Sequence, residues 1–216
     1  MMVKVSEAIG LAMQDMDVDI ATYVPGLGAT EVYYDYCTTS GQKPIISFHE
    51  EVAYTIAHGA ALAGKRAFKS VRGPIVTGDT GMSTLFALPP YNSIDVTTYM
   101  GGSVPLAIGA YLAGCKPAWA VTGDFAFIAA GHLGLLEAAQ RNIPLKVMVL
   151  YNGKSETTGG QRIPDGTLER VIKGYKEYVS YIRDPQDSDE IKEVLESAAK
   201  VNELSLIIAD FCQKER

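Results

Sequence analysis

Short apolar runs alternate with longer segments of helical periodicity along most of the chain. Apolar runs bounded by glycine, proline or asparagine are typical of strands buried on both faces, and apolar residues at every third or fourth position are typical of helices. The strands predicted in this way are 20–24, 44–48, 75–77, 96–99, 118–122, 145–151 and 205–209. The predicted helices are 5–16, 30–37, 50–63, 103–113, 131–140, 168–173 and 189–201. This alternation predicts an α/β fold, with a mostly parallel sheet covered by helices on both faces.

The α/β pattern becomes more regular after Gly73. A chain of 216 residues, 47% of them hydrophobic, can bury a core and leaves room for one or two domains. We therefore expect the chain to divide into residues 1–73 and residues 74–216.

Charge and the first residues limit the possible partners. The formal net charge is −6, and lysine and arginine are scattered rather than gathered into the basic stripe that nucleic-acid binding needs. The first residues mix charges into the apolar positions of every turn, which fits neither a signal peptide nor a membrane span. We therefore expect a cytoplasmic protein that binds neither nucleic acid nor a membrane.

The cysteines limit the redox chemistry of the chain. Cys37, Cys115 and Cys212 are far apart and odd in number. That pattern fits neither a disulfide framework nor a Cys-x-x-Cys metal or iron–sulfur motif. Any electron transfer would therefore require another subunit.

Unusual residues follow several predicted strands directly. Ligands of open parallel sheets bind at the carboxyl ends of the strands. The residues found at these ends are Asp79, Met100, Asp124 and Asn152. They are therefore the first candidates for a binding site.

Asp124 and Asn152 end two consecutive predicted strands, so we expect their side chains to be neighbours. A carboxylate and an amide oxygen at one sheet edge suit Mg²⁺, which prefers oxygen ligands and accepts phosphate oxygens as further ligands. The alternative is that both residues only build turns, as Asp and Asn commonly do after strands. Their equivalent positions favour the metal site.

Two stretches of the chain resemble known families. The spacing from Gly123-Asp124 to Asn152 resembles the thiamine-diphosphate motif, in which Gly-Asp is followed by Asn after just under thirty residues. The stretch GDTGMSTLFALPPYNSIDVTTYMGGSVPLAIGAYLAG, residues 78–114, resembles the cofactor-binding domain of the indolepyruvate ferredoxin oxidoreductases. The resemblance implies a thiamine-diphosphate-binding fold that holds thiamine diphosphate and Mg²⁺.

The resemblance also implies which residues hold the metal and the cofactor. The Mg²⁺ ligands would be the side chains of Asp124 and Asn152 and the backbone carbonyl of Lys154. Other residues implied to lie at the cofactor are Gly78, Asp79, Thr80, Gly123 and Phe125.

The segment before the helix at 103–113 carries two further expectations. Gly101, Gly102 and Ser103 open this helix, whose amino end can direct unpaired N–H groups toward phosphate. Met100 matches the bulky apolar residue that bends the cofactor in related enzymes. The alternative for Met100 is ordinary core packing.

A possible catalytic acid precedes the main motifs. The stretch HEEVAYTIAHG, which begins at His49, resembles the helix of pyrimidine-binding domains that carries an acid nine residues before a glycine. Glu50 and Gly59 fit this spacing, and the resemblance implies that Glu50 hydrogen-bonds the cofactor's pyrimidine ring. The alternative is that Glu50 and Glu51 only complement the helix dipole. Residues 1–73 then correspond to a partial pyrimidine-binding segment, and residues 74–216 to the diphosphate- and Mg²⁺-binding domain.

The resemblance implies an enzyme that acts on a 2-oxoacid as a homodimer or larger oligomer. An oxidative reaction would need an iron–sulfur or second catalytic subunit, as in a 2-oxoacid ferredoxin oxidoreductase. One alternative is a non-oxidative decarboxylase of the sulfopyruvate or phosphonopyruvate type. Another is a module that binds thiamine diphosphate without catalysis.

Overall fold

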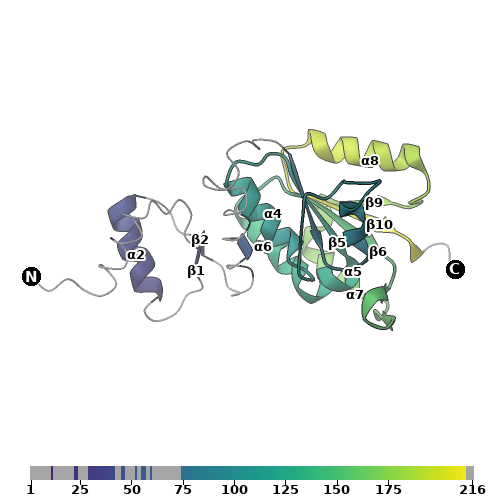
Figure 1. Ribbon diagram of the computed structural model, residues 1–216, viewed down its shortest axis with the longest axis horizontal. Helices are drawn as coiled ribbons and strands as arrows, with labels where there is room; N and C mark the ends of the chain where they lie inside the picture. Colours follow the sequence, from purple (N-terminus) through teal and green to yellow (C-terminus); the bar gives the residue numbers. More distant parts are fainter. Residues whose placement is uncertain are drawn as a thin grey trace, which may run out of the picture.

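The computed structural model describes residues 74–212 continuously, together with residues 11, 22–23, 29–41, 45–46, 52, 55–56 and 59. A six-stranded sheet forms its centre, with all neighbouring strands parallel and in the order β4-β3-β5-β6-β10-β9. Figure 1 shows this sheet with helices on both sides. The strands are β3 Ile75–Asp79, β4 Val96–Thr98, β5 Ala118–Gly123, β6 Lys146–Tyr151, β9 Val179–Ile182 and β10 Ser205–Asp210.

Alternating side chains of the sheet enter two separate cores, because successive residues of a strand point to opposite faces. Leu206 and Ile208 of β10 pack in the larger core, and Ile207 and Ala209 pack in the smaller one. The larger core contains α4 Ser103–Leu112 and α6 His132–Gln140, and the smaller contains α8 Ser188–Lys200. The predicted α/β class, with helices on both faces, is therefore confirmed.

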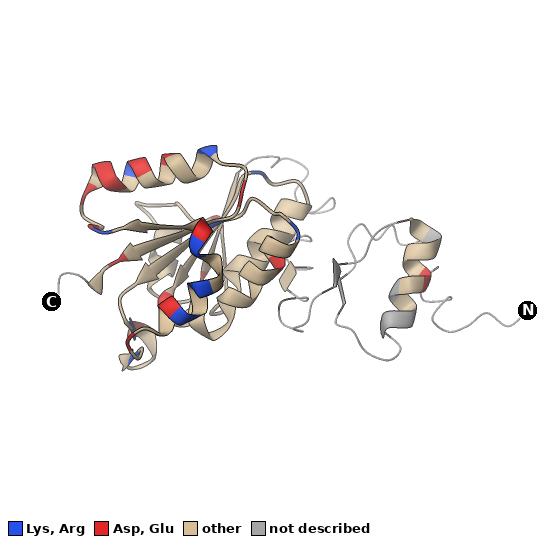
Figure 2. Ribbon diagram, turned by 180° about the vertical axis from the view of Figure 1, so that it is seen from behind, with Lys and Arg blue, Asp and Glu red and all other residues tan. Residues whose placement is uncertain are grey.

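The apolar character of the helices follows their burial. Most residues of α4 are buried, and the helix has almost no polar side chains. In contrast, α8 covers the sheet with one face only, and Figure 2 shows acidic and basic residues along its length. Asp187 caps α8 by accepting hydrogen bonds from the N–H groups of Asp189 and Glu190, at 2.9 Å and 3.2 Å. Among the residues that the structure describes, every helix falls short of the length or the hydropathy that a membrane span requires.

The strand register decides which residues meet at the carboxyl edge. Gly123 of β5 pairs with Leu150 of β6, so Asp124 and Asn152 leave the sheet from adjacent strands. Asp79 ends β3, which lies on the other side of β5 and pairs with β4. Three neighbouring strands therefore deliver polar residues to one edge.

Several elements differ from the predicted ones. The edge strand β9 lies where no strand was predicted, and the polar segment after Asn152 contains a hairpin of β7 Lys154–Ser155 and β8 Gln161–Arg162 around the short helix η3 Glu156–Thr158. The helix predicted from residue 131 begins at Asp124, as α5 Asp124–Ala126 and the π-helix η2 Phe127–Gly131, before it continues as α6.

The described residues before position 74 form local elements. β1 Thr22–Tyr23 pairs in parallel with β2 Ile45–Ile46, and α2 Ala29–Ser40 lies between them in sequence, at the purple end of the chain in Figure 1. These elements agree in place with the predicted 20–24, 30–37 and 44–48. The predicted helix 5–16 lies almost wholly outside the described residues, and the division at residue 73 stays a prediction.

A second group of these residues packs into the main domain. Val52 and Ile56 are buried in the larger core beside residues of α4. A Cβ atom at Gly59 would lie 2.1 Å from the carbonyl oxygen of Leu106 in α4. Spacing of three and four residues places Val52, Ile56 and Gly59 on one helical face, as the predicted helix 50–63 requires. This face therefore makes close contact with α4.

Candidate functional site

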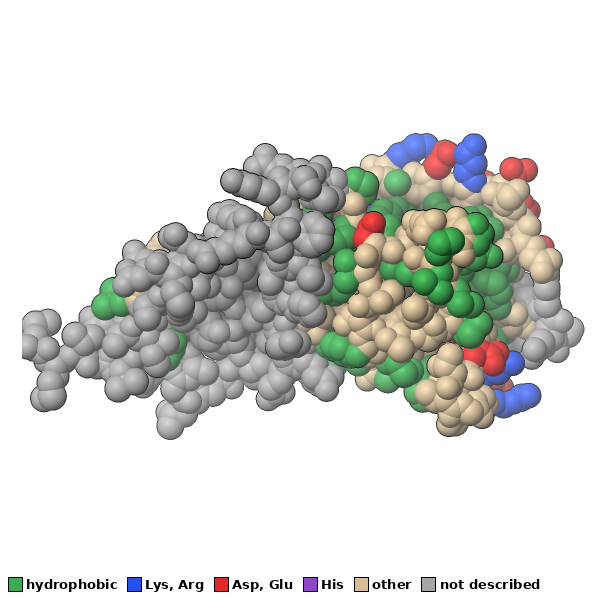
Figure 3. All heavy atoms as spheres, in the orientation of Figure 1, with side chains coloured by type: hydrophobic (Ala, Val, Ile, Leu, Met, Phe, Trp, Pro, Cys, Tyr) green, Lys and Arg blue, Asp and Glu red, His purple; other side chains and the backbone are tan. Residues whose placement is uncertain are grey.

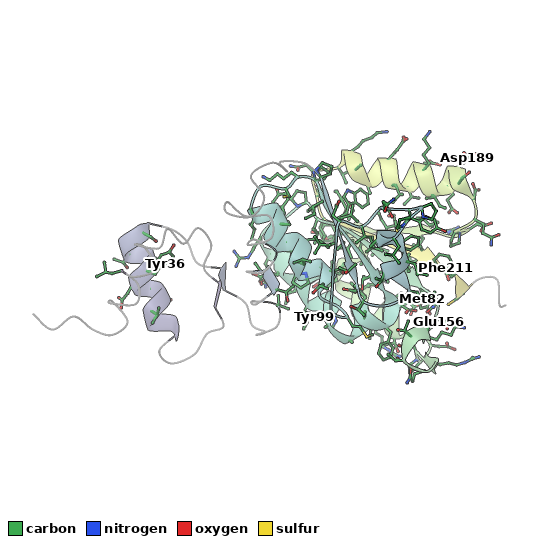
Figure 4. All side chains as sticks on the ribbon, viewed as in Figure 1. Tyr36, Met82, Tyr99, Glu156, Asp189 and Phe211 are labelled. Atoms are coloured by element: carbon green, nitrogen blue, oxygen red, sulfur yellow. The ribbon has the colours of Figure 1, made fainter. Side chains whose placement is uncertain are left out.

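A cleft opens at the carboxyl edge of the sheet. It is open to solvent and encloses about 80 Å³, less than the roughly 300–1,000 Å³ of most small-ligand sites. Loops after β3, β4, β5 and β6 all contribute to it. Its lining residues include Thr80, Gly81, Met82, Ser83, Met100, Gly123, Asp124, Phe125, Asn152, Lys154, Ser155 and Glu156. Figure 4 labels Met82 and Glu156 at this end of the domain.

Asp124 joins the ends of β5 and β6. Its side chain is 2% exposed, and one carboxylate oxygen accepts the N–H of Phe125 at 2.7 Å. The other oxygen accepts the N–H groups of Asn152 at 3.0 Å and Gly153 at 2.6 Å. A carboxylate offers about four acceptor positions, so these three bonds leave capacity for one further ligand.

Burial sets the titration of Asp124. Desolvation raises the pKa of its carboxyl group above the ordinary value, and the backbone hydrogen bonds from Gly153, Phe125 and Asn152 oppose the shift without cancelling it. A cation at this position would favour the charged form and lower the pKa again. A bound cation would therefore offset part of the cost of burying this carboxylate.

Asn152 and Lys154 continue the same turn. The side-chain oxygen of Asn152 accepts the N–H of Lys154 at 3.1 Å, which leaves its second lone pair available. Gly153 between them has a φ of +74°, a left-handed conformation that favours glycine. This tight turn brings Asn152 and Lys154 to the cleft beside Asp124.

The oxygen atoms of Asp124, Asn152 and Lys154 fit a hard divalent cation. In the described part of the chain, no group of three His, Cys, Asp or Glu side chains is placed to hold a metal. A metal here would instead take one carboxylate, one amide oxygen, one backbone carbonyl and the oxygens of a ligand or water. That set suits Mg²⁺, which is commonly bound by one or two carboxylates together with substrate phosphates.

Gly123 provides room for a ligand. Its φ of −78° and ψ of 157° are open to any residue, so its backbone conformation does not require glycine. A Cβ atom added there would meet no atom within 4 Å, although Gly123 lines the cleft. The missing side chain therefore leaves open space in the cleft at the end of β5.

Asp79 lies beneath the cleft and does not line it. It is 1% exposed; one carboxylate oxygen accepts the N–H of Ser103 at 2.7 Å, and the other accepts the Thr122 hydroxyl. Burial raises the pKa of Asp79, and these two hydrogen bonds act in the opposite direction. Asp79 therefore connects the amino end of α4 to the end of β5. The neighbouring Thr80 does line the cleft, and Gly78 packs against Ile94.

The glycine pair before α4 serves packing. Gly101 has a φ of +81°, and a Cβ atom there would lie 2.7 Å from the Cβ of Ala130. The N–H of Gly102 donates to the carbonyl of Tyr99 at 3.0 Å, and that of Ser103 donates to Asp79. The expectation of unpaired N–H groups at this helix end is therefore wrong for Gly102 and Ser103, because acceptors within the protein already engage them.

The remaining expected residues divide into two groups. Met100 and Phe125 are partly exposed and both line the cleft, so Met100 is not simply a core residue. Glu50 lies outside the described residues. Two turns of the helix predicted to carry it are described in part, and the hydroxyl of Thr55 there hydrogen-bonds the hydroxyl of Tyr99, next to Met100.

Several lining residues were not expected. Ser155 and Glu156 belong to the β7–β8 hairpin, and Met82 and Ser83 belong to the helix η1 Met82–Ala87 after β3. The Gly-, Ser- and Thr-rich composition after Asn152 was a signal of a loop at the sheet edge, but it did not indicate that the loop folds back over the cleft.

The fold and the cleft define an α/β domain with a candidate small-ligand site at the carboxyl ends of its strands. The model of the thiamine pyrophosphate enzyme C-terminal TPP-binding domain matches residues 77–209, which contain the whole cleft. The chain therefore belongs to the thiamine pyrophosphate enzyme family, and residues 77–209 are its TPP-binding domain.

Two curated relatives are similar to the chain at low identity. Indolepyruvate oxidoreductase subunit IorA of Pyrococcus abyssi is 29% identical over 161 residues, and that of Pyrococcus horikoshii is 27% identical over 161 residues. Each match covers 62% of this chain and 25% of the relative. The chain therefore spans about a quarter of the length of these relatives.

Solved structures of similar fold come from larger proteins. A structure described as a thiamin diphosphate-dependent enzyme from Mycobacterium smegmatis matches with a TM-score of 0.49 and 18% identity, over 72% of this chain and 31% of that one. Benzoylformate decarboxylase from Polynucleobacter necessarius matches with a TM-score of 0.46 and 16% identity, over 74% and 32%.

Proposed function

We propose that the chain is a thiamine-diphosphate- and Mg²⁺-dependent enzyme that acts on a 2-oxoacid. The observation that carries the proposal is the arrangement around Asp124, which lies in a TPP-binding domain and joins the turn of Asn152 and Lys154. Two side-chain oxygens and one carbonyl there have the chemistry of an Mg²⁺ site. The metal would neutralise a diphosphate that the acidic chain otherwise repels.

Each residue of the cleft then has a defined task. Asp124, Asn152 and the carbonyl of Lys154 hold Mg²⁺, and Gly123 and Thr80 leave the diphosphate room at the strand ends. Met100 and Phe125 form the wall against which the cofactor rests. Gly78, Asp79, Gly101, Gly102 and Ser103 support these groups from below.

Glu50 is the proposed acid of the reaction. When bound, thiamine diphosphate supplies the carbon nucleophile that attacks the keto group of the substrate and accepts its electrons as CO₂ leaves. The Glu50 carboxyl group, hydrogen-bonded to the cofactor's pyrimidine ring, would assist by holding the proton that tunes this ring. The contact of Val52, Ile56 and Gly59 with α4 places the described residues of this predicted helix against the domain that carries the cleft.

We further propose oxidative decarboxylation, as part of a system like the indolepyruvate or 2-oxoacid ferredoxin oxidoreductases. Two electrons would pass from the substrate to an iron–sulfur subunit, and the acyl group would pass to coenzyme A. The support is the likeness to the two IorA subunits. With only three scattered cysteines, the chain would need a partner subunit to take up the electrons.

The rival reaction is non-oxidative decarboxylation. The two reactions can be separated by measuring CO₂ release from a panel of 2-oxoacids with and without methyl viologen as electron acceptor. We expect release that requires the acceptor and coenzyme A, with reduction of the dye. Release without any acceptor, and with an aldehyde as product, would show the decarboxylase instead.

Calorimetric titration tests cofactor binding. Thiamine diphosphate is titrated into the wild type and Asp124→Asn, with and without Mg²⁺, and Asp165→Asn serves as an exposed control outside the cleft. We expect binding that requires Mg²⁺ and weakens about tenfold or more in Asp124→Asn, because the metal loses the only charged side chain of its proposed ligands. Equal affinity of all three proteins, or no binding by the wild type, would contradict the proposal.

A further inference from the structure

The β7–β8 hairpin places positive charge at the mouth of the cleft. Lys154 is the one cationic residue among the described residues that line the cleft. Arg162 lies directly opposite it in the antiparallel pair. Cross-strand partners project from the same face of a hairpin, with Cβ atoms about 4.5–5.5 Å apart. The hairpin therefore carries two neighbouring cations on one face.

Two like charges in this position are unfavourable unless an anion lies between or beside them. Glu156 is the anion that the described structure provides, and its carboxylate lies 3.0 Å from the ammonium nitrogen of Lys154. No ion pair joins Arg162 to another of the described residues. The hairpin thus has one more positive charge than it neutralises.

The Lys154–Glu156 pair is easily exchanged. The two side chains are 37% and 41% exposed, and ion pairs in contact with solvent contribute little to stability. A ligand phosphate carries more charge than one carboxylate and would attract the ammonium more strongly than Glu156 does, and a ligand carboxylate would compete with Glu156 on equal terms. Glu156 therefore holds Lys154 at the cleft without fixing it there.

We infer that Lys154 and Arg162 form a cationic arm that binds an anionic oxygen group of a ligand in the cleft, and that Glu156 holds Lys154 until the ligand arrives. The inference rests on the proposed function for the nature of the ligand. The bound group is either the terminal phosphate of the cofactor or the carboxylate of the 2-oxoacid. Figure 3 shows red and blue side chains together at the end of the domain where Figure 4 labels Glu156.

The variants separate charge from shape. Lys154→Met and Arg162→Met remove each cation, Lys154→Arg keeps the charge, and Glu156→Gln removes the competing anion. The matched control is Lys192→Met, because Lys192 is also paired with a glutamate, Glu196, but lies on α8 outside the cleft. None of these changes removes the backbone carbonyl of Lys154.

Calorimetry identifies the anion that the arm binds. Inorganic pyrophosphate and thiamine diphosphate are each titrated with Mg²⁺ present, and pyruvate or phenylpyruvate is titrated into the cofactor-loaded protein. If the arm binds phosphate, we expect Lys154→Met to lower the affinity for pyrophosphate and for thiamine diphosphate roughly tenfold. If the arm binds carboxylate, we expect Lys154→Met to lower only the affinity for the 2-oxoacid, by a similar factor. In either case Lys154→Arg and Lys192→Met retain wild-type affinity, and Glu156→Gln binds more tightly.

The salt dependence of anion affinity is a second readout. Replacing a lysine with a purely structural role would leave this salt dependence unchanged. Affinity for the anion should fall more steeply with NaCl concentration in the wild type than in Lys154→Met, because screening weakens a contact between exposed charges. Unchanged affinities for all the anions in both methionine variants would overturn the inference, as would a wild type that binds none of them. Pyrophosphate binding that depends on Lys154 but not on Asp124, in a protein that does not bind thiamine diphosphate, would refute the proposed function and leave the arm standing.

Discussion

Two buried aspartates hold the loops of the cleft together, and each does so by accepting hydrogen bonds. Asp124 accepts backbone N–H groups from the ends of two strands, and Asp79 accepts a backbone N–H from α4 and a hydroxyl from β5. Burial raises the pKa of both carboxyl groups. Their charged forms are therefore less favourable in the folded protein than in the unfolded chain.

Asp79 should make the stability of the protein depend on pH. Its folded pKa lies above the unfolded value of about 3.9, so its contribution is fully present below pH ~4 and is lost as the pH rises through the folded pKa. Asp79→Asn resembles the protonated acid and lacks this loss. We expect the melting temperature of the variant, relative to the wild type, to increase as the pH rises from 4 to 8.

Thermal denaturation followed by circular dichroism across this range is the measurement. Asp165→Asn, at an exposed position, serves as the comparison variant. A constant or decreasing difference for Asp79→Asn would contradict the assignment.

Gly123→Ala separates binding from stability. The backbone angles accept alanine and a Cβ meets no atom within 4 Å, so the variant should be as stable as the wild type or more stable by about 0.4–1 kcal/mol. The added methyl group occupies the space assigned to the diphosphate, and we expect roughly tenfold weaker thiamine diphosphate binding. Urea denaturation and calorimetry measure the two effects, and unchanged affinity would place the diphosphate elsewhere.

At the level of single residues, the sequence was sufficient to predict which residues meet when their place depends only on where a strand ends. Asp124 and Asn152 could be placed together because each directly follows an apolar strand. The position of Asp79 beneath the cleft could not be predicted, because it depends on how α4 approaches β5. The same holds for Gly101, which a three-dimensional contact with Ala130 requires to be glycine.

The contact of Val52, Ile56 and Gly59 with α4 is a close approach of two elements. Gly59→Ala would place its Cβ 2.1 Å from the backbone oxygen of Leu106, and backbone cannot move aside as a side chain can. We expect this variant to lose about 1–3 kcal/mol of unfolding free energy in urea. Gly174→Ala, where a Cβ meets nothing within 4 Å, should change it by less than about 0.5 kcal/mol. Equal stability of the two variants would show that the contact contributes nothing.

Elements with strong apolar periodicity were predicted well, and those shaped by their surroundings were not. The strands β5, β6 and β10 and the helices α4 and α8 lie where the pattern placed them. The edge strand β9 has one buried residue in four and therefore lacks a continuous apolar run. The β7–β8 hairpin is held mainly by hydrogen bonds of Ser155, Thr158 and Gln161, which hydrophobic periodicity does not detect.

The whole molecule presents an acidic chain with a binding cleft for an anionic cofactor. Because the net charge is −6, a metal ion and cations at the cleft would favour diphosphate binding. The family model matches residues 77–209, and the proposed acid, Glu50, lies before this region. Under the proposed function, catalysis would depend on both parts of the chain, whereas metal binding would depend on the second part alone.

The most direct test of the proposed enzyme is the exchange of the C2 proton of thiamine diphosphate with D₂O, followed by NMR in the presence of Mg²⁺ and the protein. This exchange needs no substrate and reports activation of the cofactor. We expect the wild type to accelerate it by roughly 10² or more over the cofactor in solution, with the acceleration lost in Glu50→Gln and in Asp124→Asn. Thiamine diphosphate that is bound but exchanges no faster than in solution would contradict an enzyme and identify a non-catalytic binding module.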